Sequence, residues 1–349
     1  MAGGLRPTPA PVEYGRKQGA GVRDTVRVMG APKTHRATEA GTQPPLLVIG
    51  GATATGKTGL SIAVARVLRE EGIPAEIISA DSRQVYRGLD IGTAKAGAEA
   101  RAGVPHHGLD LVEPDEPFSV VDFVRHAREA LTSIAAQDGV AILAGGTGLY
   151  LRAVAGGLDA DALPFDRDVR ARIEAGLERD GLAPAVARLQ EIAPRLASRI
   201  DLANPRRVAR ALEIAELRGD APPPPPTGYG GPVAWLGLRA PADVHRGWIA
   251  NRAREQFEAG LVEEARALRE RFDPALPAFS AIGYREAWAV LDGDLTREAA
   301  IELDAKRNVA FAKRQATWFR REREIEWLDA ASDTVPHALA AARAVRERA

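Results

Sequence analysis

A glycine-rich motif constrains this chain more than any other feature of the sequence. It reads Gly51-Ala52-Thr53-Ala54-Thr55-Gly56-Lys57-Thr58 and satisfies the pattern G-x-x-x-x-G-K-[ST]. The apolar run 46–49 before it predicts a strand, and the apolar spacing of residues 59–69 predicts a helix after it. This setting is typical of a phosphate-binding loop. Its backbone N–H groups and helix N-terminus would hold phosphate oxygens, Lys57 would neutralise charge, and the Thr58 hydroxyl would bind Mg²⁺.

Further apolar runs extend the pattern along the chain. Residues 76–79, 140–143 and 233–238 predict buried strands, and residues 121–136 predict an amphipathic helix. Strands that alternate with helices favour a parallel sheet covered on both faces. Residues 164–218 instead predict short helices without a strand. We therefore expect an α/β fold interrupted by a helical insertion.

The chain is long enough for more than one folding unit. Its 349 residues exceed the usual size of about 100 to 200 residues for a single domain. The first segment is rich in Gly, Pro, Ala and Thr and predicts disorder. We divide the chain into a disordered tail (1–45), the first part of the core (46–160), a helical insertion (161–220), the second part of the core with basic C-terminal helices (221–330), and a C-terminal helix or tail (331–349).

Composition excludes several classes of site. The chain has no cysteine, which rules out disulfides, thiolate metal sites and cysteine nucleophiles. No apolar run approaches the roughly 18 residues of a membrane span, so we expect no membrane segment and a cytoplasmic location. Basic and acidic residues number 47 each, and any nucleic-acid site must therefore be a local basic patch. His106 and His107 lack a carboxylate at helical spacing, and we expect them to make structural hydrogen bonds rather than bind metal.

Two polar turns follow predicted strands. Asp81 comes after the strand at 76–79, and Thr147 lies in a glycine turn after the strand at 140–143. Both turns are expected at the carboxyl edge of the sheet, where ligands bind in such folds. From position alone, Asp81 is an Mg²⁺ ligand, a general base or a helix N-cap. The strand at 140–143 has no acidic residue, which argues against a kinase. The chain has no N-K-x-D segment, which argues against a GTPase.

Eight segments, in order, resemble the tRNA dimethylallyltransferase family. They lie at 51–58, 78–95, 105–107, 145–150, 204–213, 257–264, 282–286 and 312–320. The resemblance implies a P-loop NTPase-like parallel sheet core of the α/β class with a helical insertion domain. It also implies transfer of the dimethylallyl group from dimethylallyl diphosphate to N6 of the adenine just 3′ of the tRNA anticodon. Diphosphate is released and ATP is not consumed.

The resemblance assigns roles to individual residues. Asp81 would be the general base, Thr147 would orient the site, and Arg252 would contact the diphosphate, its alternative being a solvated helix face. The whole loop from Gly51 to Thr58, with Lys57 and an Mg²⁺ ion on Thr58, would stabilise the departing diphosphate. The target adenine would flip out of its stack and enter a channel, and the diphosphate would enter this channel from the opposite side. The residues expected to contact tRNA are Asp81, Ser82, Arg83, Gln84, Thr147, Arg170, Arg206, Arg207, Arg210, Ile282, Gly283, Tyr284 and Arg285.

The sequence departs from the family at a few positions. Ala52 replaces a common proline, Thr55 a common serine and Trp248 a frequent arginine, and the stretch 308–310 is less basic than usual. Two rival functions remain, prenyl transfer to free AMP and a small-molecule kinase. The insertion and the basic C-terminal helices favour a macromolecular acceptor. We expect a monomer that binds tRNA and dimethylallyl diphosphate.

Overall fold

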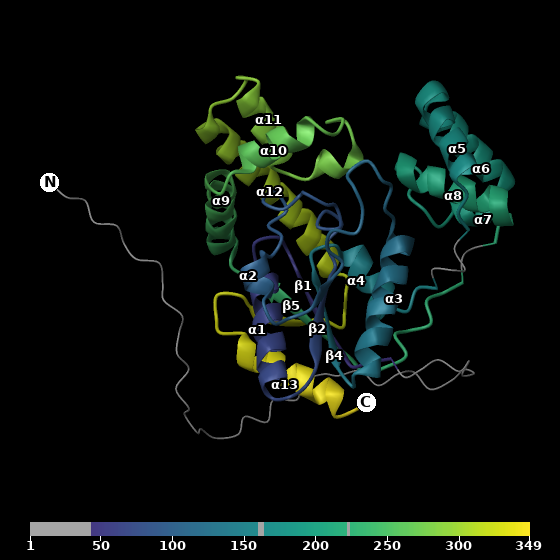
Figure 1. Ribbon diagram of the computed structural model, residues 1–349. Helices are drawn as coiled ribbons and strands as arrows, with labels where there is room; N and C mark the ends of the chain where they lie inside the picture. The colour runs from purple at the N-terminus through teal and green to yellow at the C-terminus, as the bar shows by residue number, and fades with distance from the viewer. Residues whose placement is uncertain (1–42, 160–163, 222–223) are drawn as a thin grey trace.

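A six-stranded parallel sheet forms the centre of the protein (Figure 1). The computed structural model describes residues 43–159, 164–221 and 224–349. All paired strands run parallel, in the order β3-β2-β4-β1-β5-β6. The strands are β1 (Leu46–Gly51), β2 (Ala75–Ser79), β3 (His106–His107), β4 (Val140–Gly145), β5 (Val233–Arg239) and β6 (Glu326–Asp329). The predicted α/β class and parallel sheet are confirmed.

The central strands are buried on both faces. Every residue of β1, β2 and β4 is buried, as expected for continuous apolar runs in a parallel sheet. The helices α3 (Val120–Ala136) and α4 (Gly148–Ala155) pack on one face, and α1 (Lys57–Glu70) and α13 (Val335–Arg346) pack on the other. A short helix, α2 (Ala98–Arg101), precedes β3. The last segment of the chain is therefore a packed helix and not a tail.

Four helices form a separate layer with its own small core. They are α5 (Arg167–Asp180), α6 (Leu182–Ile192), α7 (Pro194–Ala197) and α8 (Pro205–Arg218), drawn at the upper right of Figure 1. The α8 helix begins at a side-chain cap, because Asn204 accepts the N–H groups of Arg206 and Arg207. These helices lie within the segment for which the sequence predicts helices and no strand.

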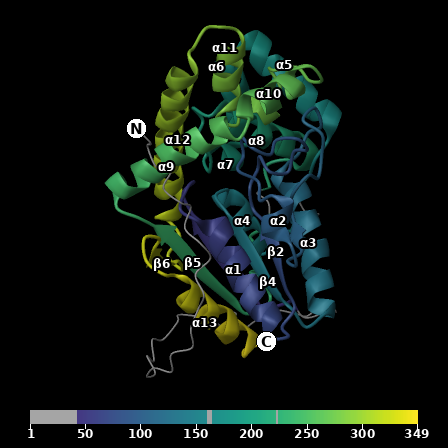
Figure 2. The same cartoon turned by 60° about the vertical axis from the view of Figure 1, so that its left-hand side comes forward.

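A second group of helices covers the carboxyl ends of the strands. It comprises α9 (Ala242–Glu258), α10 (Leu261–Arg269), the 3₁₀ helix η1 (Pro277–Ser280), α11 (Tyr284–Leu291) and α12 (Arg297–Phe319). Figure 2 shows α12 as a long helix that rises from the sheet beside α9. Phe319, the last residue of α12, is fully buried in the core between the sheet and the helices α3 and α4. Among the described residues, no helix is long and apolar enough to cross a membrane.

Candidate active site

A cavity of about 560 Å³ lies between the carboxyl edge of the sheet and the covering helices. Its walls come from segments that are far apart in the sequence. The phosphate-loop motif, the turn after β2 and the turn after β4 form one side, and α9, η1 and α12 form the other. The lining residues used below are Thr53, Gly56, Lys57, Thr58, Asp81, Ser82, Arg83, Gln84, Gly146, Thr147, Arg252, Ile282, Arg307, Asn308, Phe311, Arg314 and Gln315.

The phosphate-loop motif has the conformation that its glycines permit. Gly56 has φ 83° at the N-cap of α1, a left-handed conformation that favours glycine. Lys57 donates a hydrogen bond from Nζ to the carbonyl of Ala52 at 2.6 Å. The Thr55 hydroxyl donates to the same carbonyl at 2.8 Å. The loop therefore closes on itself and leaves Thr58 exposed at the cavity.

The electrostatics of Lys57 suit a buried anion. Burial, together with the nearby Arg252 guanidinium, lowers the pKa of Lys57 to about 8, and Asp81 opposes both effects. Burial also lowers the pKa of Arg252. Two cations thus face one cavity. A bound anion with several negative charges would relieve this repulsion.

Asp81 and Thr147 are joined through the backbone between their turns. The Asp81 carboxylate accepts the N–H of Arg83 at 2.8 Å, and the Thr147 hydroxyl oxygen accepts the N–H of Ser82 at 3.0 Å. No helix begins after Asp81, because the residues that follow form turns. The helix N-cap alternative for Asp81 is therefore wrong. Its carboxylate lines the same cavity as Lys57.

The two turns approach so closely that only glycine fits between them. A Cβ atom on Gly145 would clash with the carbonyl oxygen of Ala80. The backbone N–H of Thr147 donates to that same carbonyl at 3.1 Å. The glycines of this turn therefore serve the close contact between two strand ends, which places Thr147 beside Asp81.

Arg252 points into the cavity from α9. Its guanidinium donates to Oδ1 of Asn308 at 3.3 Å, and Asn308 donates in turn to Oδ1 of Asp304 at 2.7 Å. Asp304 is almost fully buried, and this burial raises its pKa to about 6. The solvated-face alternative for Arg252 is therefore wrong. Asn308 belongs to the stretch 308–310, where the resemblance led us to expect more basic residues.

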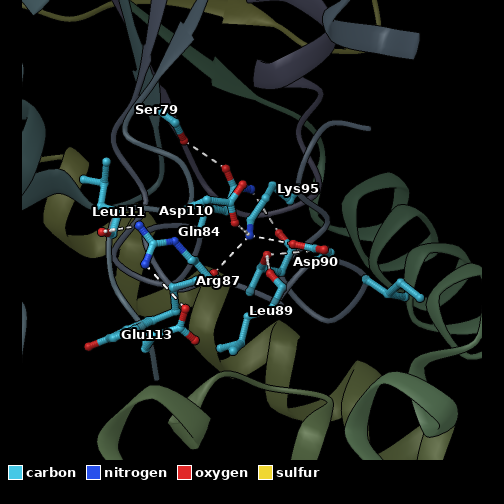
Figure 3. A network of polar contacts seen from close by, with 12 residues as sticks. Ser79, Gln84, Arg87, Leu89, Asp90, Lys95, Asp110, Leu111 and Glu113 are labelled. Carbon is cyan, nitrogen blue, oxygen red and sulfur yellow. Dashed lines mark hydrogen bonds and ion pairs between the residues drawn. The ribbon is translucent and has the colours of Figure 1, made fainter. Parts of the chain in front are cut away.

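The turn after β2 is held by an internal polar network (Figure 3). Lys95 is buried and donates to Asp90 and Asp110 at 2.6 Å each, and to the carbonyl of Tyr86 at 3.0 Å. Gln84 accepts the Ser79 hydroxyl at 2.9 Å and donates to two backbone carbonyls, those of residues 93 and 94. The amide of Gln84 is thus engaged within the protein, although the residue borders the cavity. The side-chain amide that we expected to contact tRNA therefore already bonds groups of the protein.

Outside the insertion, the predicted tRNA-contact residues other than Gln84 fall into three groups. Ser82, Arg83 and Ile282 line the cavity together with Asp81 and Thr147. Arg285 is exposed at the start of α11, and Gly283 is buried with φ 111°. Tyr284 has no exposed surface, and its hydroxyl donates to Glu264 at 2.7 Å. The predicted RNA contact of the Tyr284 side chain is wrong, because this ring packs in the interior.

The four arginines of the insertion do not line the cavity. Arg170 and Arg210 form ion pairs with the fully buried Glu213, at 3.5 and 2.7 Å. Arg206 and Arg207 are exposed in the first turn of α8. The structure therefore gives Arg170 and Arg210 a role inside the insertion and leaves the side chains of Arg206 and Arg207 on the surface.

The adjacent histidines make the expected structural hydrogen bonds. His106 bonds the carbonyl of Val104 at 2.8 Å, and His107 bonds the carboxylate of Glu76 at 2.6 Å. Across the described ranges of the chain, no three His, Asp or Glu side chains gather as a metal cluster.

The helix α12 contributes a wall of the cavity that the sequence did not predict. Arg307, Phe311, Arg314 and Gln315 line it at a helical spacing of four, three and one residues. That spacing is visible in the sequence as one face of a helix. Nothing in the sequence shows which element this face meets, and its place at the site therefore emerges only from the fold.

Comparisons with known proteins show which family the chain resembles. The family model described as IPP transferase matches residues 84–322. The tRNA dimethylallyltransferase of Symbiobacterium thermophilum is 41% identical over 289 residues, covering 82% of this chain and 89% of the relative. The tRNA dimethylallyltransferase of Anaeromyxobacter dehalogenans is 44% identical over 311 residues, covering 84% and 97%.

Solved structures support the same assignment. The tRNA isopentenylpyrophosphate transferase of Bacillus halodurans superposes with a TM-score of 0.62 at 37% identity, covering 88% of this chain and 97% of that chain. A eukaryotic dimethylallyltransferase described as acting on tRNA superposes with a TM-score of 0.69 at 25% identity, covering 86% and 78%. A phosphate loop, a carboxylate and a half-buried arginine thus face one cavity in a chain that matches these enzymes over most of its length. The chain belongs to the IPP transferase family, the enzymes named tRNA dimethylallyltransferases.

Proposed function

We propose that this protein transfers the dimethylallyl group from dimethylallyl diphosphate to N6 of the adenine just 3′ of the anticodon in tRNA. The reaction releases diphosphate, and we place it in the cytoplasm with the protein acting as a monomer. One observation carries the proposal. Lys57 and Asp81 line a single cavity, so an anion-binding group and a proton acceptor face the same space.

The phosphate loop and Arg252 would hold the diphosphate. Departure of diphosphate breaks the bond between its oxygen and the allylic carbon, and negative charge develops on that oxygen. Lys57, Arg252 and the N-terminus of α1 are cationic or dipolar groups already aimed at the cavity. Because they are fixed before the reaction, they stabilise this charge without reorganisation.

The donor set at the loop fits Mg²⁺. Thr58 offers an exposed hydroxyl at the cavity, and the described residues provide no cluster of three ligating side chains. Mg²⁺ usually keeps several waters and binds substrate phosphates with only one or two protein groups. Thr58 would hold such an ion, which when bound neutralises part of the diphosphate charge.

Asp81 would accept the proton of the attacking amine. The adenine N6 lone pair is delocalised into the ring and makes a weak nucleophile. As the bond between N6 and the allylic carbon forms, the amine proton passes to the Asp81 carboxylate. A positioned base of this kind typically contributes about 10² to 10⁴ in rate. The bond from Ser82 to Thr147 holds the turn that carries this carboxylate.

The acceptor would be a macromolecule. Ser82, Arg83 and Ile282 line the cavity, and the exposed Arg206 and Arg207 lie in the first turn of a helix of the insertion. An adenine that reacts at a half-buried carboxylate inside a cavity must leave its stack and enter that cavity. The surrounding phosphates would then lie against exposed basic residues outside it.

A labelling experiment tests the proposal. Purified protein is incubated with labelled dimethylallyl diphosphate and Mg²⁺, together with unmodified tRNA, with a tRNA whose adenine 3′ of the anticodon is replaced by guanine, or with AMP. We expect label in the first RNA and in neither control. Label in AMP would identify a free-nucleotide prenyltransferase. Absence of label in every arm, with phosphate transfer from ATP to a small molecule, would identify a kinase.

A further inference from the structure

Gln315 connects the phosphate loop to the turn that carries Thr147. It lies on α12 and is only 8% exposed. Its Oε1 accepts the N–H of Thr53 at 2.8 Å, and its Nε2 donates to the carbonyl of Gly146 at 2.9 Å. One side-chain amide thus spans two loops that are separated by almost a hundred residues. The N–H of Thr53 is engaged and is not among the amides that face a diphosphate.

The orientation of this amide is fixed by its partners. A backbone N–H can only donate and a backbone carbonyl can only accept, so Oε1 must face Thr53 and Nε2 must face Gly146. The carbonyl of Thr53 accepts a further hydrogen bond from His245 of α9 at 2.7 Å. The backbone of Thr53 is therefore hydrogen-bonded to two covering helices, through its N–H to α12 and through its carbonyl to α9.

Close packing leaves little freedom to this bridge. A Cβ atom on Gly146 would clash with Nε2 of Gln315. Phe319, one turn further along α12, is fully buried, and a Cβ atom on Gly50 would lie 2.8 Å from its ring. The helix that carries Gln315 is thus anchored to β1, the strand that leads into the phosphate loop. The backbone of Gln315 therefore has a fixed position relative to β1.

The two ends of the bridge lead to the two reacting groups. Thr53 belongs to the loop that holds Lys57, and Gly146 precedes Thr147, which fixes the turn of Asp81 through Ser82. Transfer of a prenyl group requires the leaving diphosphate and the incoming amine to lie on opposite sides of one carbon. Their separation is therefore set by the distance between these two loops. A misplacement of about 1 Å can cost about 10²-fold in rate.

We propose that Gln315 is a positioning residue that sets the spacing between the diphosphate loop and the Asp81 turn. This inference rests on the proposed prenyl transfer. Gln315 acts through Thr53 and Gly146 and takes no part in bond making or proton transfer. A change at this position should therefore lower kcat and weaken use of the prenyl donor, and it should leave tRNA affinity unaltered.

Gln315→Leu and Gln315→Glu test the proposal. Leucine removes both bonds, whereas glutamate keeps the acceptor for Thr53 and removes the donor for Gly146. We expect kcat to fall about 10- to 100-fold in both, with KM for tRNA within about twofold of the wild type. Gln137→Leu is the control for loss of a side-chain amide away from the site, since Gln137 is exposed and its amide bonds Glu76 and Ser133, neither of which lines the cavity. Melting temperatures of all variants show whether each is folded.

A double-mutant cycle with Gly146→Ala supplies a second test. The added methyl group should displace the Gln315 amide and lower kcat on its own. In Gln315→Ala the space is open, so Gly146→Ala should add little further loss, and the two effects should be strongly non-additive. Independent, additive effects would contradict the bridge.

The outcomes separate this inference from the proposed function. Folded Gln315→Leu protein with wild-type kcat and donor KM would overturn the positioning role and leave prenyl transfer intact. A loss of activity that only follows a lower melting temperature, or that Gln137→Leu shares, would also overturn it. A wild-type protein that labels no RNA would refute the proposed function before any variant is compared.

Discussion

The hydroxyl oxygen of Thr147 accepts the backbone N–H of Ser82 at 3.0 Å and so joins the turn after β4 to the turn after β2. The hydroxyl keeps its own proton, because an oxygen of this kind can accept and donate together. It can therefore donate toward a ligand in the cavity while it holds the residue next to Asp81. The geometry makes Thr147 a support for the carboxylate at position 81.

Asp81→Asn should remove the carboxylate that accepts the proton and keep the size of the side chain. We expect kcat to fall by about 10² to 10⁴, with little change in the affinity for tRNA or dimethylallyl diphosphate. Single-turnover kinetics with labelled donor and filter binding of tRNA measure the two effects. Asp115→Asn serves as the control, because Asp115 is exposed and lies outside the cavity. Turnover above a tenth of the wild-type value would remove Asp81 from the role of base.

Lys57 should make donor binding depend on pH. Its pKa is lowered to about 8 in the free protein, so the ammonium form is lost as the pH rises through that value. A diphosphate binds the ammonium form better and is expected to lose affinity above about pH 8, by up to tenfold per pH unit. Calorimetric titration with inorganic diphosphate from about pH 6.5 to 9.5 measures this dependence. Lys57→Met should bind weakly and lose this pH dependence, and an unchanged profile would assign it to another group.

Asp304 should make stability depend on pH. Burial raises its folded pKa to about 6 from an ordinary value of 3.8, so the protonated form favours folding. That contribution is present at low pH and is lost as the pH rises through about 6. The free energy of unfolding of the wild type relative to Asp304→Asn should therefore fall by about 1 kcal/mol between about pH 5 and 7.5. Urea unfolding at both pH values measures this difference.

The exposed Asp294 provides the comparison for that experiment. Asp294→Asn measures how much of the pH-dependent difference comes from the removal of an exposed carboxylate. If Asp304→Asn behaved in the same way, its carboxyl group would have an ordinary pKa in the folded protein.

Arg206 and Arg207 should act on tRNA affinity through charge. Replacement of both by alanine should weaken tRNA binding and lower the slope of log affinity against log salt by about 0.7 to 0.9 for each phosphate that the protein no longer neutralises. Turnover at saturating tRNA should be unchanged. The double substitution of Arg66 and Arg69, which are exposed on α1, controls for removal of surface charge alone. Equal salt slopes for the two double variants would remove α8 from the RNA-binding surface.

The core of the fold could be predicted because its signals are local. The strands β1, β2, β4 and β5 are continuous apolar runs. The glycine-rich motif at the end of β1 is typical of a loop between a strand and a helix. Two strands were not predicted. β3 has only two residues and β6 has four, with acidic residues at both ends. Segments this short show no usable period, and only their neighbours in the sheet define them.

The site could be predicted only in part, for a related reason. Lys57, Asp81 and Thr147 follow strands, so the sequence places them at one edge of a sheet. Gln315 meets Thr53 across 262 positions of the chain, and no local pattern encodes that contact. For Tyr284 the sequence predicted an RNA contact that the structure does not allow, because its ring is fully buried in the core. Long-range packing decided both cases.

The position of β1 at the centre of the sheet has a consequence for biosynthesis. This strand is synthesised before both of its partners in the sheet, and one of them, β5, follows the whole insertion. During translation at about 5 to 20 residues per second, one edge of a fully apolar strand stays without its partner while the intervening helices are made. The nascent protein should therefore depend on chaperones until residue 239 has emerged, and fragments that end before β5 should aggregate.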